Sequence, residues 1–141
     1  MHTSFRVHSL YDSGSAVILE DSSILCQPFF GVLDGVSGLY VPNQGPRLFD
    51  GFSGGQKVVQ IVSSSFTLAK ASEYLPVILL RANNSIRKFA REHGISLASS
   101  DLLPGTMFTF VKIEKDTIEI LQGGDSTAIW ETKNGKTQAV S

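Results

Sequence analysis

Acidic residues close or interrupt several apolar stretches of this sequence. Glu20 and Asp21 follow "AVIL", Asp34 follows "FFGVL", and Asp125 lies within "LQGGDSTAIW". A carboxylate at the end of a buried strand must be hydrogen-bonded, exposed or bound to a cation, because burying an unpaired charge is costly. Mg²⁺ and Mn²⁺ prefer oxygen ligands, and a glycine such as Gly35 lets a backbone carbonyl approach an ion. The residues alone leave two interpretations open: a divalent-metal site, or acids that serve turns and helix caps.

Other kinds of catalytic site fit the sequence less well. The "DSGS" at residues 12–15 matches the active-site turn of aspartic proteases, but helical central segments do not suit that all-β fold, and an Asx turn at Asp12 is simpler. Ser126 lacks both a Gly-x-Ser-x-Gly elbow and a histidine partner. The "GFSGGQK" segment lacks phosphate-loop spacing, because Val58 follows its lysine. Three histidines and one cysteine, Cys26, are too widely separated for a zinc site.

The composition indicates one globular domain with a substantial core. The chain has 141 residues, of which 42% are hydrophobic, and a net charge of -1. Balanced charge argues against nucleic-acid binding, and no apolar stretch approaches the roughly 20 residues that span a bilayer. The first residues also lack the apolar region of a secretory signal. We therefore expect a cytoplasmic protein without nucleic-acid or membrane partners, with organellar targeting left open.

Short strands on either side of two helices must position the acids. The helices are expected from about Gln56, with Ser53 as N-cap, and from Pro76 to just before Gly94. A polar, glycine-rich surface loop is expected over residues 41–55. The expected strands are residues 5–10, 16–19, 24–33 with an interruption at Gln27-Pro28, 106–113, 117–122 and 126–131, with "KNGK" turning into a last strand. This order predicts an α+β domain with mostly antiparallel strands.

Four short motifs, taken in order, resemble those of the PP2C (PPM) family of metal-dependent serine/threonine protein phosphatases. That family has a Glu-Asp pair on an early strand, an Asp-Gly-x-x-Gly turn after the next strand, a Gly-Thr start to a strand after the helices, and a later Gly-Asp-Ser motif. The corresponding residues are Glu20-Asp21, Asp34-Gly35 with Gly38, Gly105-Thr106 and Gly124-Asp125-Ser126. The resemblance spans about residues 7–130, and the order of the motifs carries it because each motif alone is weakly specific.

The resemblance implies an antiparallel β-sandwich with flanking helices and a centre of two Mn²⁺ or Mg²⁺ ions between the sheets. It implies that Asp34 bridges the ions and is the catalytic residue, and that the Gly35 carbonyl helps to hold one ion. Glu20 and Asp21 would contact metal directly or through water, and Asp125 would hold a third, weaker ion. The implied reaction is hydrolysis of phosphoserine or phosphothreonine in a phosphoprotein substrate by a metal-bridged water.

The chain departs from the family pattern in length and just before the Glu-Asp pair. PP2C domains are about twice as long, within the ordinary range for one domain, and their later half supplies further metal-binding aspartates. The Arg and Asn that often precede the pair are missing, and Leu19 stands at the Asn position. Residues 1–141 are expected to form the amino-terminal portion of a PP2C-like domain, about half of it, completed by a second segment or by a second copy in a homo-oligomer. The alternative is a catalytically incomplete PP2C-like module that binds or scaffolds a partner.

Overall fold

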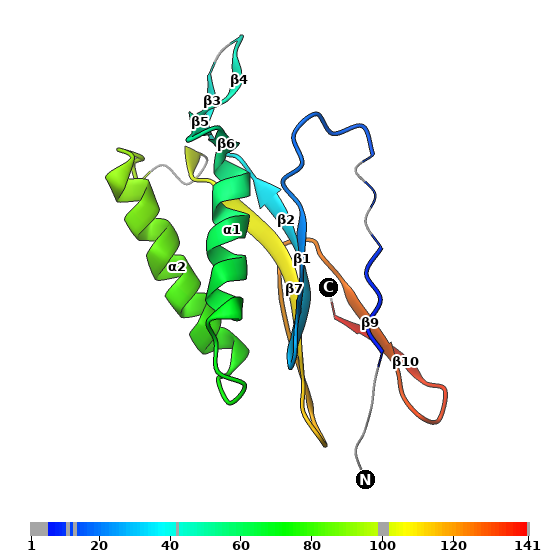
Figure 1. The fold of residues 1–141 in the computed structure, drawn as a ribbon. Coiled ribbons are helices and arrows are strands. Elements are labelled where there is room, and N and C mark those ends of the chain that lie inside the picture. Colours follow the sequence, from blue (N-terminus) through cyan, green and yellow to red (C-terminus); the bar gives the residue numbers. More distant parts are fainter. Residues whose placement is uncertain (1–5, 11, 13, 42, 99–101, 141) are drawn as a thin grey trace.

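Two helices cover one face of a four-stranded antiparallel sheet, and a β-hairpin lies on the other side (Figure 1). The computed structural model describes residues 6–10, 12, 14–41, 43–98 and 102–140. The elements are β1 (Ser22–Cys26), β2 (Phe29–Val36), β3 (Tyr40–Val41), β4 (Gly45–Pro46), β5 (Leu48–Phe49), β6 (Phe52–Ser53), α1 (Gly54–Thr67), α2 (Leu75–Glu92), β7 (Gly105–Ile113), β8 (Ile118–Gly123), β9 (Ala128–Glu131) and β10 (Thr137–Val140). None of the helices in these described ranges is both long and apolar enough to cross a membrane.

The main sheet has the strand order β1-β2-β7-β8, with β2 and β7 at its centre. β1 and β2 are separated at Gln27-Pro28, where the sequence predicts an interruption. In the central pair Asp34 lies opposite Met107, and in the next pair Phe108 lies opposite Gly123. This register brings the segments that carry three of the four predicted motifs to the same end of the sheet.

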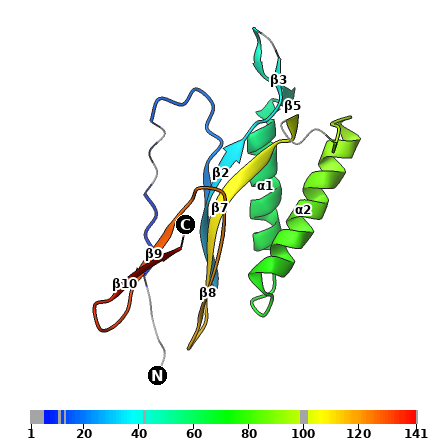
Figure 2. The ribbon, with the colours of Figure 1, turned by 180° about the vertical axis from the view of Figure 1, so that it is seen from behind.

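Alternation along β2 assigns its side chains to two different faces. Phe29 and Leu33 are buried beneath the helices, whereas Val32 and Asp34 are exposed on the face without helices. Seen from behind in Figure 2, the hairpin β9–β10 and the segment before β1 again lie on the side away from α1 and α2. We call the side of the main sheet that carries Asp34 the helix-free face.

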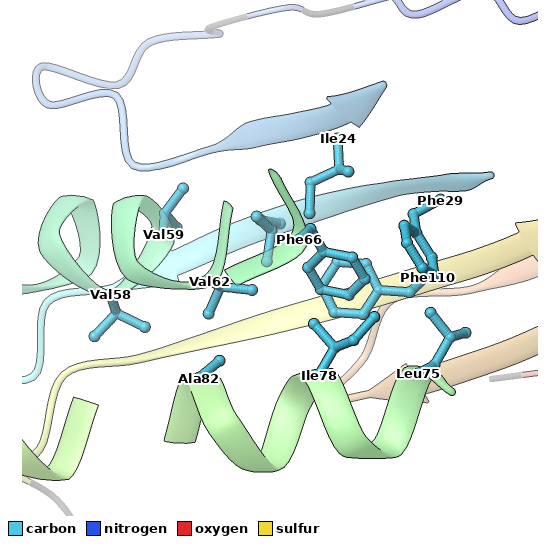
Figure 3. Packing of buried hydrophobic residues seen from close by; sticks show 11 residues of the cluster. Ile24, Phe29, Val58, Val59, Val62, Phe66, Leu75, Ile78, Ala82 and Phe110 are labelled. Carbon is cyan, nitrogen blue, oxygen red and sulfur yellow. The ribbon is translucent and has the colours of Figure 1, made fainter. Parts of the chain in front are cut away.

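The hydrophobic core lies between the helices and the main sheet (Figure 3). Phe66 of α1 and Phe110 of β7 are fully buried, with ring centroids 4.4 Å apart. The buried residues of this cluster are Ile24, Phe29, Leu33, Val58, Val59, Val62, Phe66, Leu75, Ile78, Ala82 and Phe110. Burial of these side chains fixes both helices against the sheet, because removal of apolar surface from water is the main stabilising contribution.

Both predicted helices are confirmed, together with the signals that begin and end them. Ser53 caps α1 in a capping box: its hydroxyl accepts from the Gln56 N–H at 3.2 Å, and the Gln56 side chain accepts from the Ser53 N–H at 2.9 Å. Pro76 lies in the first turn of α2. Gly94, just beyond its end, has a φ of +67°.

The strands predicted at residues 5–10 and 16–19 are wrong. Residue 5 lies outside the described residues, and residues 6–10 and 16–19 form no strand. Leu10 and Val17 are almost fully exposed, at 99% and 98%. A segment with a β-type sequence forms a strand only where a neighbouring strand supplies hydrogen-bond partners and its apolar side chains can be buried. The described residues of these two ranges pair with no strand and leave apolar side chains exposed.

The predicted surface loop at residues 41–55 contains more structure than expected. Two small hairpins, β3–β4 and β5–β6, interrupt it before α1 begins. Asp50 and Gly51 connect β5 to β6 with φ angles of 52° and 83°. An Asp-Gly pair with two positive φ values is a favoured two-residue hairpin turn, so the local signal was present in the sequence.

The hairpin predicted at "KNGK" is confirmed, with a last strand after it. Thr132 and Lys136 bracket the turn, with the Thr132 N–H donating to the Lys136 carbonyl at 2.9 Å. Only Gly135 of the Asn-Gly pair takes a positive φ, at +79°. The connection is therefore the longer kind of hairpin turn that ends in a left-handed glycine, and not the two-residue turn with two positive φ values that Asn-Gly favours.

Candidate metal centre

Asp34 is exposed on the helix-free face, near the end of the central strand β2. Its backbone is fixed on two sides. It lies opposite Met107 in the ladder, and its carbonyl accepts a hydrogen bond from the Thr106 hydroxyl at 2.9 Å. Thr106 belongs to the predicted Gly-Thr motif, so that motif contributes directly to holding the residue expected to be catalytic.

Asp21 is the acidic residue with the largest effect on the pKa of Asp34. The pKa of Asp34 is raised above its ordinary value, first by loss of hydration, and then by the negative charge of Asp21 and a hydrogen bond between the two carboxyl groups. Both residues line one cavity of about 500 Å³, together with Asp12 and Ser126. Two neighbouring carboxyl groups in the lining of one open cavity repel when both are ionised, and a divalent cation bound by both would relieve that repulsion.

Asp125 reaches the same region from the turn after β8. Its negative charge contributes to the raised pKa of Asp34. The Gln122 side chain holds this turn by donating to the Gly124 carbonyl at 2.5 Å and to the Ser126 carbonyl at 2.9 Å. Gly124 has a φ of +88°, and a Cβ there would lie 2.5 Å from the Met107 side chain. Glycine is therefore required for the turn to pass close to the strand that pairs with Asp34.

Glu20 is engaged differently from the three aspartates. Its carboxylate accepts hydrogen bonds from the hydroxyls of Ser37 and Ser53, at the N-terminus of α1. A Cβ at Gly55 would lie 2.7 Å from the carboxyl carbon, so the first turn of the helix is in close contact with the acid. A negative charge at this position is stabilised by the positive end of the helix. Of the two interpretations left open by the sequence, the helix-cap interpretation describes Glu20 in this arrangement, although its charge still acts on Asp34.

Gly35, near the end of β2, is buried against the segment before β1 and the first turn of α1. A Cβ at Gly35 would lie 2.7 Å from the Glu20 carbonyl oxygen and 3.0 Å from the Gly55 carbonyl carbon. The absence of a side chain therefore lets three backbone segments meet here. This close approach positions Glu20 and Asp21 beside the end of β2.

The donor set fits a hard divalent cation through a pair of carboxylates. Within the described ranges, no group of three or more His, Cys, Asp or Glu side chains lies close enough to hold an ion. Asp21 and Asp34 form the pair, and Asp125 is near enough for its charge to act on it. Mg²⁺ commonly binds proteins through one or two carboxylates and keeps water in its other positions, and Asp21 and Asp34 supply oxygen donors of that type.

Asp12 is the acid of this cavity that the sequence analysis did not include in the site. The predicted Asx turn is present, because the Gly14 N–H donates to the Asp12 carboxylate at 2.9 Å. The same residue also lines the cavity with Asp21 and Asp34. No local spacing links these three acids, and the residues described around Asp12 form no strand, so only the tertiary structure brings Asp12 there.

The fold is that of PP2C-type serine/threonine phosphatases, as the order of motifs predicts. The chain is similar in structure to the Mycobacterium tuberculosis serine/threonine phosphatase PstP/Ppp, with a TM-score of 0.62 and 15% sequence identity. The match covers 94% of this chain and 49% of the phosphatase chain, so the chain spans about half its length. No protein-family model and no curated protein sequence matches the chain significantly. The expected fold class, α+β with antiparallel sheets corresponding to about half of a PP2C domain, is confirmed.

Proposed function

We propose that residues 1–141 form part of a metal-dependent protein serine/threonine phosphatase that hydrolyses phosphoserine and phosphothreonine in protein substrates. The observation that supports this function best is that Asp34 and Asp21 line the same 500 Å³ cavity, where the charge of Asp21 acts on Asp34. The fold shared with a serine/threonine phosphatase adds to that support. The proposal covers the phosphatase domain as a whole, of which this chain would supply the amino-terminal portion.

In this proposal Asp21 and Asp34 hold Mg²⁺ or Mn²⁺, the Gly35 carbonyl assists, and Asp125 serves a third ion. Bound divalent ions would supply a water of lowered pKa and would stabilise the charge that develops on the phosphoryl group. Asp34 is the central ligand of the proposed site, because the charges of Asp21, Asp125 and Glu20 all act on it. Ser126 lines the same cavity, and in this proposal its hydroxyl would donate a hydrogen bond to a phosphate oxygen.

The remaining metal ligands would come from a second segment or from a second copy of the chain. Glu20 belongs to the proposed metal site through its charge, and its release from Ser37 and Ser53 would let it contact metal or metal-bound water. The competing function is a catalytically incomplete module that binds a partner. In such a module Glu20 would stay engaged with Ser37 and Ser53 at the helix N-terminus and would not serve as a metal ligand.

Hydrolysis of a small aryl phosphate with Mn²⁺, with Mg²⁺ and with EDTA tests the proposal. Asp34→Asn is the test variant. Asp116→Asn is the matched control, because Asp116 is an exposed turn acid beyond the opposite end of β7. Metal-dependent turnover that is lost in the first variant and kept in the second is the expected result.

Calorimetric titration with Mn²⁺ separates the two candidate functions if there is no turnover. Binding that is lost in Asp34→Asn would indicate an incomplete module that keeps half of a metal site. Absence of both turnover and binding would overturn the metal centre at Asp34.

A further inference from the structure

One side chain at the start of α1 contacts two separate segments of the chain. The Gln56 Oε1 atom accepts a hydrogen bond from the Ser53 N–H at 2.9 Å, and its Nε2 atom donates to the Leu19 carbonyl, also at 2.9 Å. The first bond belongs to the capping box of the helix. A glutamate in the same position could make the first bond but not the second, because an ionised carboxylate has no hydrogen to donate. The amide of Gln56 is therefore needed only for the contact with Leu19.

Leu19 lies two residues before Asp21, in a segment without strand partners. The main sheet begins at Ser22, and residues 19–21 form no helix or strand. No sheet ladder therefore fixes the backbone that carries Asp21. The hydrogen bond from Gln56 holds this backbone at Leu19, with a single residue between the contact and Asp21.

The residue in between, Glu20, is held by the same turn of the helix. Its carboxylate accepts a hydrogen bond from the Ser53 hydroxyl, and a Cβ at Gly55 would lie 2.7 Å from its carboxyl carbon. The start of α1 therefore contacts both of the residues that precede Asp21. Asp21 itself lines the 500 Å³ cavity together with Asp34.

α1 is a rigid support for these contacts. Val58, Val62 and Phe66 of this helix are almost fully buried and pack in the core against the main sheet. The capping box fixes the first turn of the helix. A metal ligand that is positioned by a rigid element loses less conformational freedom when it binds an ion, and outer contacts of this kind raise metal affinity.

We propose that Gln56 is a positioning residue of the metal centre: by donating to the Leu19 carbonyl, it fixes the backbone that presents Asp21 beside Asp34. The inference rests on the proposed function, since it gives Gln56 a role in holding the same divalent ion. Gln56 acts through Asp21 and is not itself a ligand. Without its hydrogen bond to Leu19, Asp21 must be ordered when the ion binds, and that entropic cost weakens binding.

Calorimetric titration of the full chain with Mn²⁺ tests this role in three variants. Gln56→Glu keeps the capping box and removes the bond to Leu19. Gln56→Met is close in size and removes both bonds without adding charge. Gln60→Glu is the matched control, because Gln60 is exposed one turn further along the same helix and receives the same charge. Urea unfolding of each variant measures stability separately.

Both Gln56 variants are expected to raise the Kd for Mn²⁺ about tenfold, within the range for lost outer contacts of a metal ligand. The added charge of Gln56→Glu attracts a cation, so weaker binding in that variant opposes the direct effect of the charge. Gln60→Glu should change the Kd by less than about twofold, because salt screens an exposed charge. Since Gln56→Met also loses half of the capping box, its urea midpoint should fall below that of Gln56→Glu.

The outcomes separate the positioning role from the proposed function. A Kd in both Gln56 variants that matches the control would overturn the positioning role and leave the proposed function standing, whether or not the urea midpoint falls. Weakening in only one of the two variants would also overturn it, because the new charge or the lost cap would then be the cause. Absence of Mn²⁺ binding by the unsubstituted chain would overturn the proposed metal centre, and the positioning role with it.

Discussion

The two faces of the central sheet differ in what covers them. On the helix-covered face, Leu33 and Phe110 are buried in a continuous apolar core. On the helix-free face, Val32 and Asp34 are exposed, although Asp34 lies directly after Leu33 in the same strand. Adjacent residues of one strand therefore lie in two different environments, one inside the apolar core and one open to solvent.

The comparison shows how this protein tolerates a group of acids next to its core. Asp34 needs a rigid backbone, which the buried neighbours Leu33 and Gly35 provide from the other face. It also needs contact with water or a cation, which only the helix-free face offers. The exception is Glu20, which lies between the two environments and takes its hydrogen bonds from Ser37 and Ser53.

The two faces should differ most in the free energy of unfolding that is lost when a side chain is truncated. Phe110→Ala removes a fully buried ring that contacts Phe66, and we expect it to lower the free energy of unfolding by about 3–5 kcal/mol. Val32→Ala on the helix-free face should cost less than about 1 kcal/mol, because Val32 is 52% exposed. Urea unfolding of both variants measures these values. Similar losses would mean that the second face is covered as fully as the first.

A smaller effect is expected at the glycine that links the two faces. Gly35→Ala would place a Cβ 2.7 Å from the Glu20 carbonyl oxygen, and we expect it to lower the free energy of unfolding by about 1–3 kcal/mol. Gly105→Ala, at the end of the adjacent strand, has no atom within 4 Å of the added Cβ and is the matched control. Urea denaturation compares the two variants. An equal loss in the control would show that strand glycines matter here for reasons other than close contact.

A still smaller change, of opposite sign, is expected at Asp34. Because its folded-state pKa is raised, its contribution to stability declines as the pH rises through that pKa, and the ionised form disfavours folding at neutral pH. Asp34→Asn should therefore stabilise the metal-free protein at pH 7, by less than about 1 kcal/mol because solvent screens an exposed charge. Thermal unfolding in EDTA measures this gain, and Asp116→Asn should show none. A loss of stability in Asp34→Asn would contradict the inferred repulsion.

The smallest effect is expected at an ion pair on the helix-covered face. Lys112 is buried and its ammonium lies 2.7 Å from Glu114, which lowers the pKa of Glu114 through a hydrogen bond and charge. The stability that this pair contributes is present above the ordinary glutamate pKa and is lost as the pH falls through the lowered folded-state value. Urea unfolding over a series of acidic pH values should show a weaker pH dependence for Glu114→Gln than for Glu131→Gln, an exposed control on β9. Identical pH profiles would show that the pair contributes nothing.

Much of the fold could be predicted because its signals are local. Ser53, Pro76 and Gly94 mark helix ends through backbone chemistry that depends only on nearby residues. The segment at residues 16–19 was mispredicted because strand formation depends on partners that are distant in sequence. For the same reason, the small hairpin at Asp50-Gly51 was visible only as a turn signal within an expected loop.

The sequence by itself determined which residue types are available to the site and the order in which they occur. Asp21, Asp34 and Asp125 each stand where an apolar run ends, and charge at such a point requires an explanation. The tertiary structure alone decided that Asp34 faces Asp21, that Asp12 joins the same cavity, and that Glu20 turns to the start of α1. The physical reason is that a carboxylate's surroundings are set by which strands pair and how closely their backbones approach, and those contacts join residues that the sequence keeps apart.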